Sequence, residues 1–419
     1  MKVLSSLIFA LLIVSNSMFA QVPARKCATH ENNLKKLAAD PNYLEKRSAL
    51  NTPTPTYSNK KVSSETMYTI PIVIHVIHNG EAVGISGNIS DEQIFSAITA
   101  LNNDFRSTNS DTLVPTHPFY SLQADINMEF CLAKQDGAGE PTTGILRYDK
   151  GQSSWGIDDF EDNVKPGTIW DITKYLNIWI ITFGSPDTYT LGYASLPGWS
   201  DPTEVGVVIG ATYFGTTGNL STPYDQNRTA THEVGHFFNL SHIWGDATCG
   251  TDNVSDTPTQ EGPNTDLCPS FPHNVAGPCS PGPNGEMIMN YMDYTTDACM
   301  QMFTTGQKDR MRAAVLLSDR LSLTTSSACD EPSSTTHISS GDFNIYPNPS
   351  KNVVSVSAPG HFKIEGIKVY NINGQEMNVT FNIGNRQSII NTASLDNGSY
   401  FVTIVGATGT AYKNLIILK

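Results

Sequence analysis

The sequence contains few charged residues, few basic ones in particular, and no long apolar run. Charged residues make up 16% of the 419 residues, and 26 Lys and Arg stand against 40 Asp and Glu, for a formal net charge of -14. Because nucleic acids are bound through cationic surfaces, and no basic patch is present, we expect no nucleic-acid partner. A membrane-spanning helix needs about 20 apolar residues. No segment reaches that length, so we expect no transmembrane segment.

A short apolar run at the N-terminus predicts secretion. Lys2 precedes an apolar stretch at residues 7–14, and small and polar residues follow up to Ala20. This order is typical of a removable signal peptide and is too short for a membrane anchor. We therefore predict a secreted protein, and its acidity suits an extracellular, calcium-binding one.

Cysteine is scarce and odd in number, with seven residues in the whole chain. Secretion favours disulfides, so an unpaired thiol needs a reason. Cys27 lies far upstream of the others, which form an even set. This distribution predicts three disulfides in the mature protein and one thiol in a removable segment. The even set is Cys131, Cys249, Cys268, Cys279, Cys299 and Cys329.

Composition divides the rest of the chain into successive segments. Residues 21–65 are polar and turn-rich, which is typical of a cleavable pro-segment. Residues 66–330 carry strand and helix patterns and form the main predicted folded domain. A linker rich in Ser and Thr follows at 331–342, and 343–419 contains short alternating strands separated by turns.

These patterns predict an α+β protein. Apolar, β-branched runs predict strands at 68–77, 126–133, 176–183 and 205–215. Ser90 and Asp91 precede a helical pattern at 92–106, and a second helix is expected at 305–321. We expect a mixed twisted sheet with backing helices, followed by a small antiparallel β-sandwich over 343–419.

Residues 229–246 contain the pattern HExxH. Residues four apart on a helix lie on nearly the same face, one turn apart, so His232 and His236 can point at one metal ion. Imidazole nitrogens bind zinc at about 2.0–2.1 Å, and a catalytic zinc keeps one position open for water. Glu233 flanks the same face and can take a proton from that water as a general base.

A third ligand requires the helix to end first. His242 is ten residues after His232, which is about 15 Å along an unbroken helix. Asn239 lies between His236 and His242, and Asn tolerates a left-handed backbone better than any residue except Gly. We predict a turn at Asn239 that brings His242 to the metal.

HExxH alone can arise by chance on a buried helix whose histidines have only structural partners. The third histidine and the secreted context favour a zinc site. One rival interpretation is a surface adhesin with a degenerate zinc core, against which the intact Glu233 argues. An exopeptidase is less favoured, because no feature predicts a pocket for a substrate terminus.

The segment HEVGHFFNLSH, with the later NYMDY, resembles the metzincin signature, HExxHxxGxxH followed by a methionine turn. From IPIVIHVIH to about Ser322 the chain resembles the pappalysin family, through FCLA, VSDTPTQ, NYMDYTTDACMQMF and TGQKDRMR. It departs from the pattern at Asn239, where Gly is usual. The resemblance implies a zinc metalloendopeptidase that hydrolyses peptide bonds of protein or peptide substrates.

The resemblance also implies roles for residues beyond the motif. Met292 would form the hydrophobic base under the zinc, and Tyr294 would hydrogen-bond a tetrahedral intermediate. Core packing is the alternative for both. Asp297 would line the pocket for the side chain after the scissile bond and favour Arg or Lys there, unless it is a solvated loop carboxylate.

The irregular stretch 248–286 has few apolar residues and is expected to depend on disulfides or bound ions. Asp252, Asp256 and Asp266 offer hard oxygen ligands. The resemblance implies calcium here, whereas without it solvated turn carboxylates would be favoured. It also implies disulfides Cys249–Cys279 and Cys268–Cys299, which leaves Cys131 and Cys329 as the remainder.

Cys27, in ARKCATHE, is the thiol left over. In related proenzymes a thiolate of the pro-segment occupies the open position of the zinc. We interpret Cys27 as such a zymogen switch, with Arg25 or Lys26 helping to hold it as an anion. The alternative is a leftover reactive thiol in a disordered pro-segment.

The segment 343–419 resembles the type A sorting domain of the type IX secretion system. FNIYPNPSKN opens it, LDNGSYFVTI comes near its end, and KNLIILK closes it. This resemblance implies export by the type IX machinery, followed by release or attachment to the outer cell surface. A carbohydrate-binding sandwich is the alternative, but the segment has no Trp to stack on sugars.

Overall fold

The computed structural model divides the chain into two compact units, Met1–Cys329 and Asp330–Lys419. The described residues are 26–51, 66–199, 201–265, 268–274, 277–316, 318–332, 343–359, 362–384, 387–406 and 409–419. The expected signal peptide, most of the linker and Asp266 lie outside these residues.

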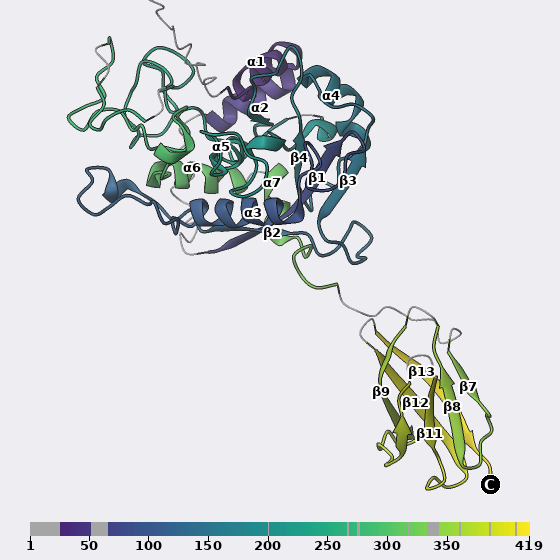
Figure 1. Ribbon diagram of the computed structural model, residues 1–419. Coiled ribbons are helices and arrows are strands. Elements are labelled where there is room, and N and C mark those ends of the chain that lie inside the picture. Colours follow the sequence, from purple (N-terminus) through teal and green to yellow (C-terminus); the bar gives the residue numbers. More distant parts are fainter. Residues whose placement is uncertain are drawn as a thin grey trace, which may run out of the picture. The chain divides into compact units, whose positions relative to one another are not determined.

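The first unit is built on a mixed sheet with strand order β2-β1-β4-β6-β5 (Figure 1). The long strand β1 (Tyr68–His78) pairs in parallel with β2 (Met128–Leu132), β3 (Ile145–Asp149) and β4 (Leu176–Ile181). Strand β6 (Val207–Gly210) continues the parallel order, and β5 (Gly192–Ala194) runs antiparallel to it at one edge. The expected mixed sheet is confirmed.

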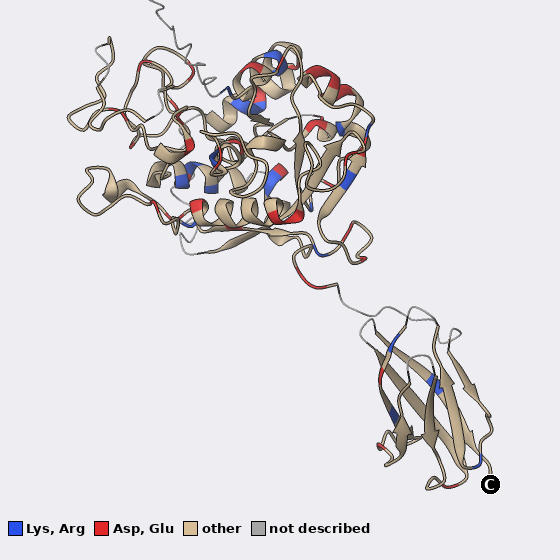
Figure 2. Cartoon of the chain, in the orientation of Figure 1, with Lys and Arg blue, Asp and Glu red and all other residues tan. Residues whose placement is uncertain are grey.

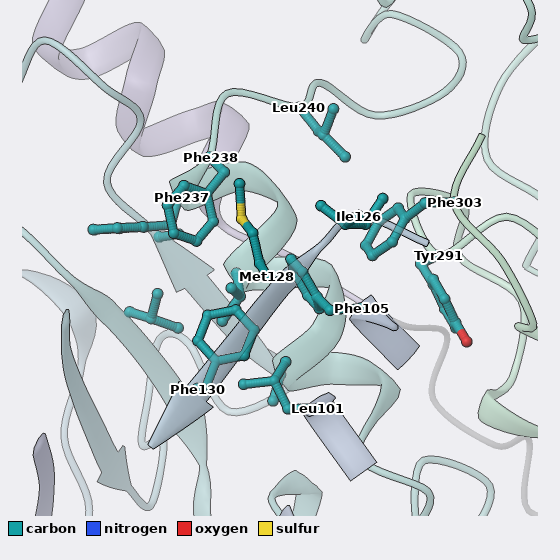
Figure 3. Close-up of a cluster of buried hydrophobic side chains, with 14 of the residues drawn as sticks. Leu101, Phe105, Ile126, Met128, Phe130, Phe237, Phe238, Leu240, Tyr291 and Phe303 are labelled. Carbon is teal, nitrogen blue, oxygen red and sulfur yellow. The ribbon is translucent and has the colours of Figure 1, made fainter. Parts of the chain in front are cut away.

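Helices cover both faces of this sheet. Successive side chains of β1 point to opposite faces, so this strand contributes to a core on each side. On one face, Ile70, Ile72 and Ile74 pack in the main core, to which α3 (Asp91–Phe105) and α5 (Arg228–Phe237) contribute. Figure 3 shows aromatic side chains gathered there, among them Phe105, Phe130, Phe237 and Phe303. On the other face, α4 (Ile157–Asn163) packs Phe160 with Trp179 and Ile181.

The N-terminal segment differs from the expectation of a polar, turn-rich stretch. It forms α1 (Thr29–Ala39) and α2 (Pro41–Asn51). Tyr43 and Arg47 of α2 are buried, so tertiary contacts with the rest of the first unit stabilise helices whose own sequence is mostly polar. A local pattern could not reveal partners that lie more than 100 residues away.

Two other elements are shorter than expected. The predicted strand 205–215 ends at Gly210 and is followed by a 3-10 turn, Ala211–Tyr213. The predicted helix 305–321 is divided into α6 (Thr305–Val315) and α7 (Ser318–Leu321). The side chain of Thr304 accepts from the Gln307 amide and so caps α6.

The second unit consists of two antiparallel sheets with a common core, as expected for a β-sandwich. One sheet has the order β10-β11-β8-β7 and the other β13-β12-β9. Val354, Val402 and Leu415 are fully buried between them. The strands are β7 (Asn344–Tyr346), β8 (Val353–Ser357), β9 (Ile364–Asn371), β10 (Thr380–Asn382), β11 (Gln387–Asn391), β12 (Gly398–Gly406) and β13 (Gly409–Ile417).

Three disulfides tie the first unit together. Cys249–Cys279 and Cys268–Cys299 cross-link the irregular stretch, and Cys131–Cys329 joins β2 to the end of the unit. Cys27 is the one described cysteine with a free thiol, and it is buried.

Candidate active site

The helix α5 carries the HExxH motif through the middle of the first unit, and all of its residues are buried. It begins after Asn227, whose φ of 67° is positive. Asp297 Oδ2 accepts the amides of Gln226 and Arg228 at 2.9 and 3.2 Å, and so caps the start of the helix. The Arg228 guanidinium pairs with Asp104 and Asp111, which fixes this end to the core.

The helix ends as the sequence predicts, at a left-handed turn. Asn239 has a φ of 78°, and the Leu240 amide bonds back to the Gly235 carbonyl at 3.0 Å. This turn returns the chain toward the helix and places His242 Nε2 3.1 Å from His236 Nε2. His236 Nε2 is also 3.1 Å from His232 Nε2, so the predicted turn is confirmed and the three rings converge.

Each imidazole is oriented by an acceptor at its other nitrogen. His232 Nδ1 lies 2.7 Å from the Tyr291 carbonyl, His236 Nδ1 2.8 Å from the Leu240 carbonyl, and His242 Nδ1 2.5 Å from Asp246 Oδ1. These contacts direct the three Nε2 atoms toward one point. No sequence pattern predicted the two carbonyl acceptors. Asp246 could have been found as an acid four residues after a ligand histidine.

The donor set fits zinc. Three nitrogens about 2.05 Å from a tetrahedral ion would be about 3.3 Å apart, close to the 3.1 Å separations seen here. Burial lowers the pKa of His236 to about 3, so its nitrogen carries a lone pair rather than a proton. Cys27 Sγ belongs to the same group, whose four donor atoms all lie within 4.8 Å of one another.

The NYMDY turn packs against the helix and the turn that carry the three histidines. Met292 is fully buried, and its carbonyl accepts the Ile243 amide at 3.2 Å, next to His242. A Cβ atom at Gly235 would lie 2.8 Å from Met292 Sδ. Glycine within the motif therefore lets the methionine pack directly against α5.

Glu233 and Tyr294 lie beside the cluster, and both contact Cys27. Glu233 is 1% exposed, and its Oε2 accepts from Cys27 Sγ at 3.3 Å and Thr29 Oγ1 at 2.9 Å. The Tyr294 hydroxyl is 3.1 Å from His242 Nε2 and donates to the Cys27 carbonyl at 3.3 Å. Burial, together with Cys27 and Glu233, raises the pKa of Tyr294 well above its usual value, so it keeps its proton.

Residues 26–29 occupy the outer edge of β5. The Ala28 amide donates to the Gly192 carbonyl at 3.1 Å, and the Leu191 amide donates to the Lys26 carbonyl at 2.9 Å. The Ala194 amide donates to Thr29 Oγ1 at 2.8 Å. This arrangement holds Cys27 over the three histidines. Thr29 was not singled out from the sequence, because no local pattern marks it.

The charges around Cys27 differ from those expected. Lys26 is exposed, Arg25 lies outside the described residues, and the nearest charged group is Glu233. Burial and the Glu233 carboxylate raise the pKa of the thiol well above its usual range. Only a cation at the histidine cluster would reverse this effect.

The remaining acidic residues that were predicted as site residues are either buried or cap the start of a helix. Asp252 accepts from Thr257 Oγ1, and burial raises its pKa to about 6. Asp256 accepts from Thr304 Oγ1 and the Gly306 amide at the start of α6. Asp297 is fully buried at the start of α5, so it is not a solvated carboxylate.

Comparison with known proteins agrees with this site. The family model described as pregnancy-associated plasma protein-A matches residues 159–316, and that of the secretion system C-terminal sorting domain matches 344–418. An extracellular metalloprotease of Arthroderma benhamiae is 29% identical over 58% of this chain and 76% of its own length. One from Colletotrichum graminicola is 27% identical over 68% and 87%.

Two solved structures are also similar. Mirolysin in complex with a compound is 40% identical, with a TM-score of 0.58, over 64% of this chain and 99% of that one. A promirolysin mutant of Tannerella forsythia is 37% identical, with a TM-score of 0.64, over 72% and 97%.

The fold and the histidine cluster therefore define a metalloprotease of the metzincin type, a class that uses zinc. The C-terminal unit is a sorting domain of the type IX system, so the protein is secreted or carried on the cell surface. The chain belongs to the pappalysin family. No helix among the described residues is long and apolar enough to cross a membrane.

Proposed function

We propose that this chain is a zinc-dependent endopeptidase, made as a latent precursor and exported by the type IX machinery. The convergence of His232, His236 and His242 beside Glu233 carries the proposal. These three histidines would hold the zinc, with Met292 packed beneath them. When bound, zinc polarises the scissile carbonyl and lowers the pKa of a water toward about 7.

Glu233 is the general base in this proposal. Its Oε2 accepts from Cys27 and Thr29 while residues 26–29 are in place. Once they leave, the same oxygen can accept a proton from the attacking water and deliver it to the leaving amine. Tyr294 stays protonated, so its hydroxyl can donate a hydrogen bond to the oxyanion that develops on the substrate carbonyl.

Cys27 is the zymogen switch. It is positioned by the contacts with β5 and shares the donor cluster of the histidines, so it blocks both the metal and the base. We assign residues 1–20 to the signal peptide, 21–65 to the pro-segment, 66–330 to the catalytic domain, 331–342 to the linker and 343–419 to the sorting domain.

Two further assignments concern specificity and calcium. Asp297 is a fully buried carboxylate beside the start of α5, and we propose that it favours Arg or Lys after the scissile bond. Calcium would be held through Asp252, whose buried carboxylate accepts from the Val254 amide and the Thr257 hydroxyl. Asp256 is the second proposed calcium ligand, and its carboxylate also caps the start of α6.

The experiment that tests the function is cleavage of a diverse peptide library by the processed protein, with its metal content measured. Internal cleavage that is lost on chelation and restored by zinc supports the endopeptidase. Release of terminal residues alone would indicate an exopeptidase. A folded, zinc-loaded protein that cleaves nothing would favour the adhesin.

A further inference from the structure

Lys36, on α1, is held against the catalytic unit by an aromatic ring and a carboxylate together. Its ammonium lies 2.6 Å from Glu204 Oε2 and 5.5 Å from the centroid of the Trp199 ring. The Trp199 indole N–H donates to the same carboxylate oxygen, so the ring and the acid are fixed relative to each other. The Lys36 and Glu204 side chains are only 20% and 27% exposed, so this contact is better shielded than an open surface pair.

This contact lies at a cavity of about 360 Å³ between α1 and the catalytic unit. Asn32, Lys35 and Ala39 line it from α1, and Tyr193, Ala194 and Ser195 line it from β5 and the residue after it. Removal of the pro-segment takes one wall away. The cavity then becomes an open groove along β5.

The groove becomes acidic when α1 leaves. Figure 2 shows acidic residues along α4 and basic residues on α1, and Lys35 pairs with Asp158 at 3.0 Å. Lys165 also lines the cavity, but its buried ammonium lies 2.8 Å from Glu161 Oε1 and so already has an acidic partner. The carboxylate of Glu204 therefore loses its cationic partner and remains beside the face of Trp199.

A peptide that pairs with the edge strand β5 would run past this groove. Residues 26–28 add to the outer edge of β5 through Gly192 and Leu191, and an extended substrate can use the same backbone groups. Such a substrate passes Ala194, which lines the groove. We propose that Trp199 and Glu204 form a substrate subsite for a Lys or Arg side chain, which Lys36 fills in the precursor. This inference rests on the proposed function, in which residues 21–65 are removed from a peptidase.

The test uses pairs of peptides that differ only in Lys or norleucine, placed in turn at each position around one scissile bond except the position directly after it. The residue directly after that bond is held constant, so Asp297 does not contribute to the comparison. For the full chain after processing, we expect a preference for Lys of about five- to tenfold in kcat/KM at one position. The preference falls to about one in Glu204→Gln. It stays intact in Glu140→Gln, a matched change at an exposed acid outside the groove.

Binding of the same peptides to a processed Glu233→Ala protein, measured by calorimetry, separates the subsite from the catalytic proposal. Binding that depends on Lys and on Glu204 supports the subsite even where no sample cleaves. Cleavage or binding with the same Lys preference in wild type and Glu204→Gln at every position overturns it, and Lys36 then serves the precursor alone.

Discussion

The Cys27 thiol donates to Glu233 Oε2 at 3.3 Å, and the neighbouring Thr29 hydroxyl donates to the same oxygen at 2.9 Å. The proposed general base is therefore occupied by two residues of the segment that also covers the histidine cluster. In the proposed precursor, residues 26–29 would keep the site inactive by covering it, because the three histidines and Glu233 are already close together beneath them.

Replacing Cys27 should weaken this block. In the full chain, Cys27→Ala removes the thiol from the donor cluster, while the β5 contacts of residues 26 and 28 remain. We expect peptide cleavage by the unprocessed precursor to rise by about tenfold or more, since lost metal ligation is worth several kcal/mol. Initial rates, with the chain length checked by mass spectrometry, measure this. Ser48→Ala, an exposed change on α2, should leave the precursor latent, and a Cys27→Ala precursor as latent as wild type would refute the switch.

Tyr294→Phe should slow turnover without removing the metal. The hydroxyl lies 3.1 Å from His242 Nε2, where it can donate to the substrate oxyanion. Loss of one such donor typically costs about 10²–10³ in kcat, and KM should change much less. Steady-state kinetics with zinc analysis measure both. An unchanged kcat with zinc intact would leave Tyr294 a packing residue.

Gly235→Ala should destabilise the fold beneath the zinc site. The new Cβ would lie 2.8 Å from Met292 Sδ, and such overpacking typically costs about 1–3 kcal/mol. Thermal unfolding of wild type and variant gives the difference. The control is Gly137→Ala, because nothing lies within 4 Å of a Cβ there. Equal unfolding temperatures for the two variants would mean that the Met292 side chain moves aside without a loss of stability.

His75 should make the first unit sensitive to acid. Burial in the sheet, beside Asn177 and Trp179, lowers the pKa of His75 from its usual 6.5 to about 4. The folded state therefore binds this proton more weakly than the unfolded state. Stability is complete above pH 6.5 and is lost as the pH falls toward 4, by about 3 kcal/mol.

The measurement for His75 is the unfolding temperature of wild type and His75→Gln between pH 7.5 and 4.5. The variant should lose less stability over this range than wild type does, because the titrating ring is gone. Comparison with the variant also subtracts acid-driven zinc loss, which affects both proteins. Parallel curves would show that His75 does not titrate in this range.

The sequence predicted the parts of this molecule whose chemistry is local. The HExxH spacing brings His232 and His236 together by helix geometry, and Asn239 marks the turn because few side chains accept its positive φ. Strand and helix patterns predicted the sheet and α3 for the same reason.

Contacts between distant segments could not be predicted in that way. Helices α1 and α2 depend on the catalytic unit for burial of Tyr43 and Arg47. Thr29 and Tyr291 act through a hydroxyl and a backbone carbonyl, which carry no sequence signature. The cap that Asp297 places on α5 could not be predicted either, because the two segments lie about 70 residues apart in the sequence.

The most direct test of the account is a comparison of Glu233→Ala with wild type, both freed of residues 21–65 and both analysed for zinc. Glu233 is the proposed base and is not among the clustered donors that could hold a metal. We predict that the variant keeps one zinc per chain and loses peptide cleavage by about 10³-fold or more. A variant that cleaves at the wild-type rate with its zinc in place would contradict the assignment of the base, and with it the proposed mechanism.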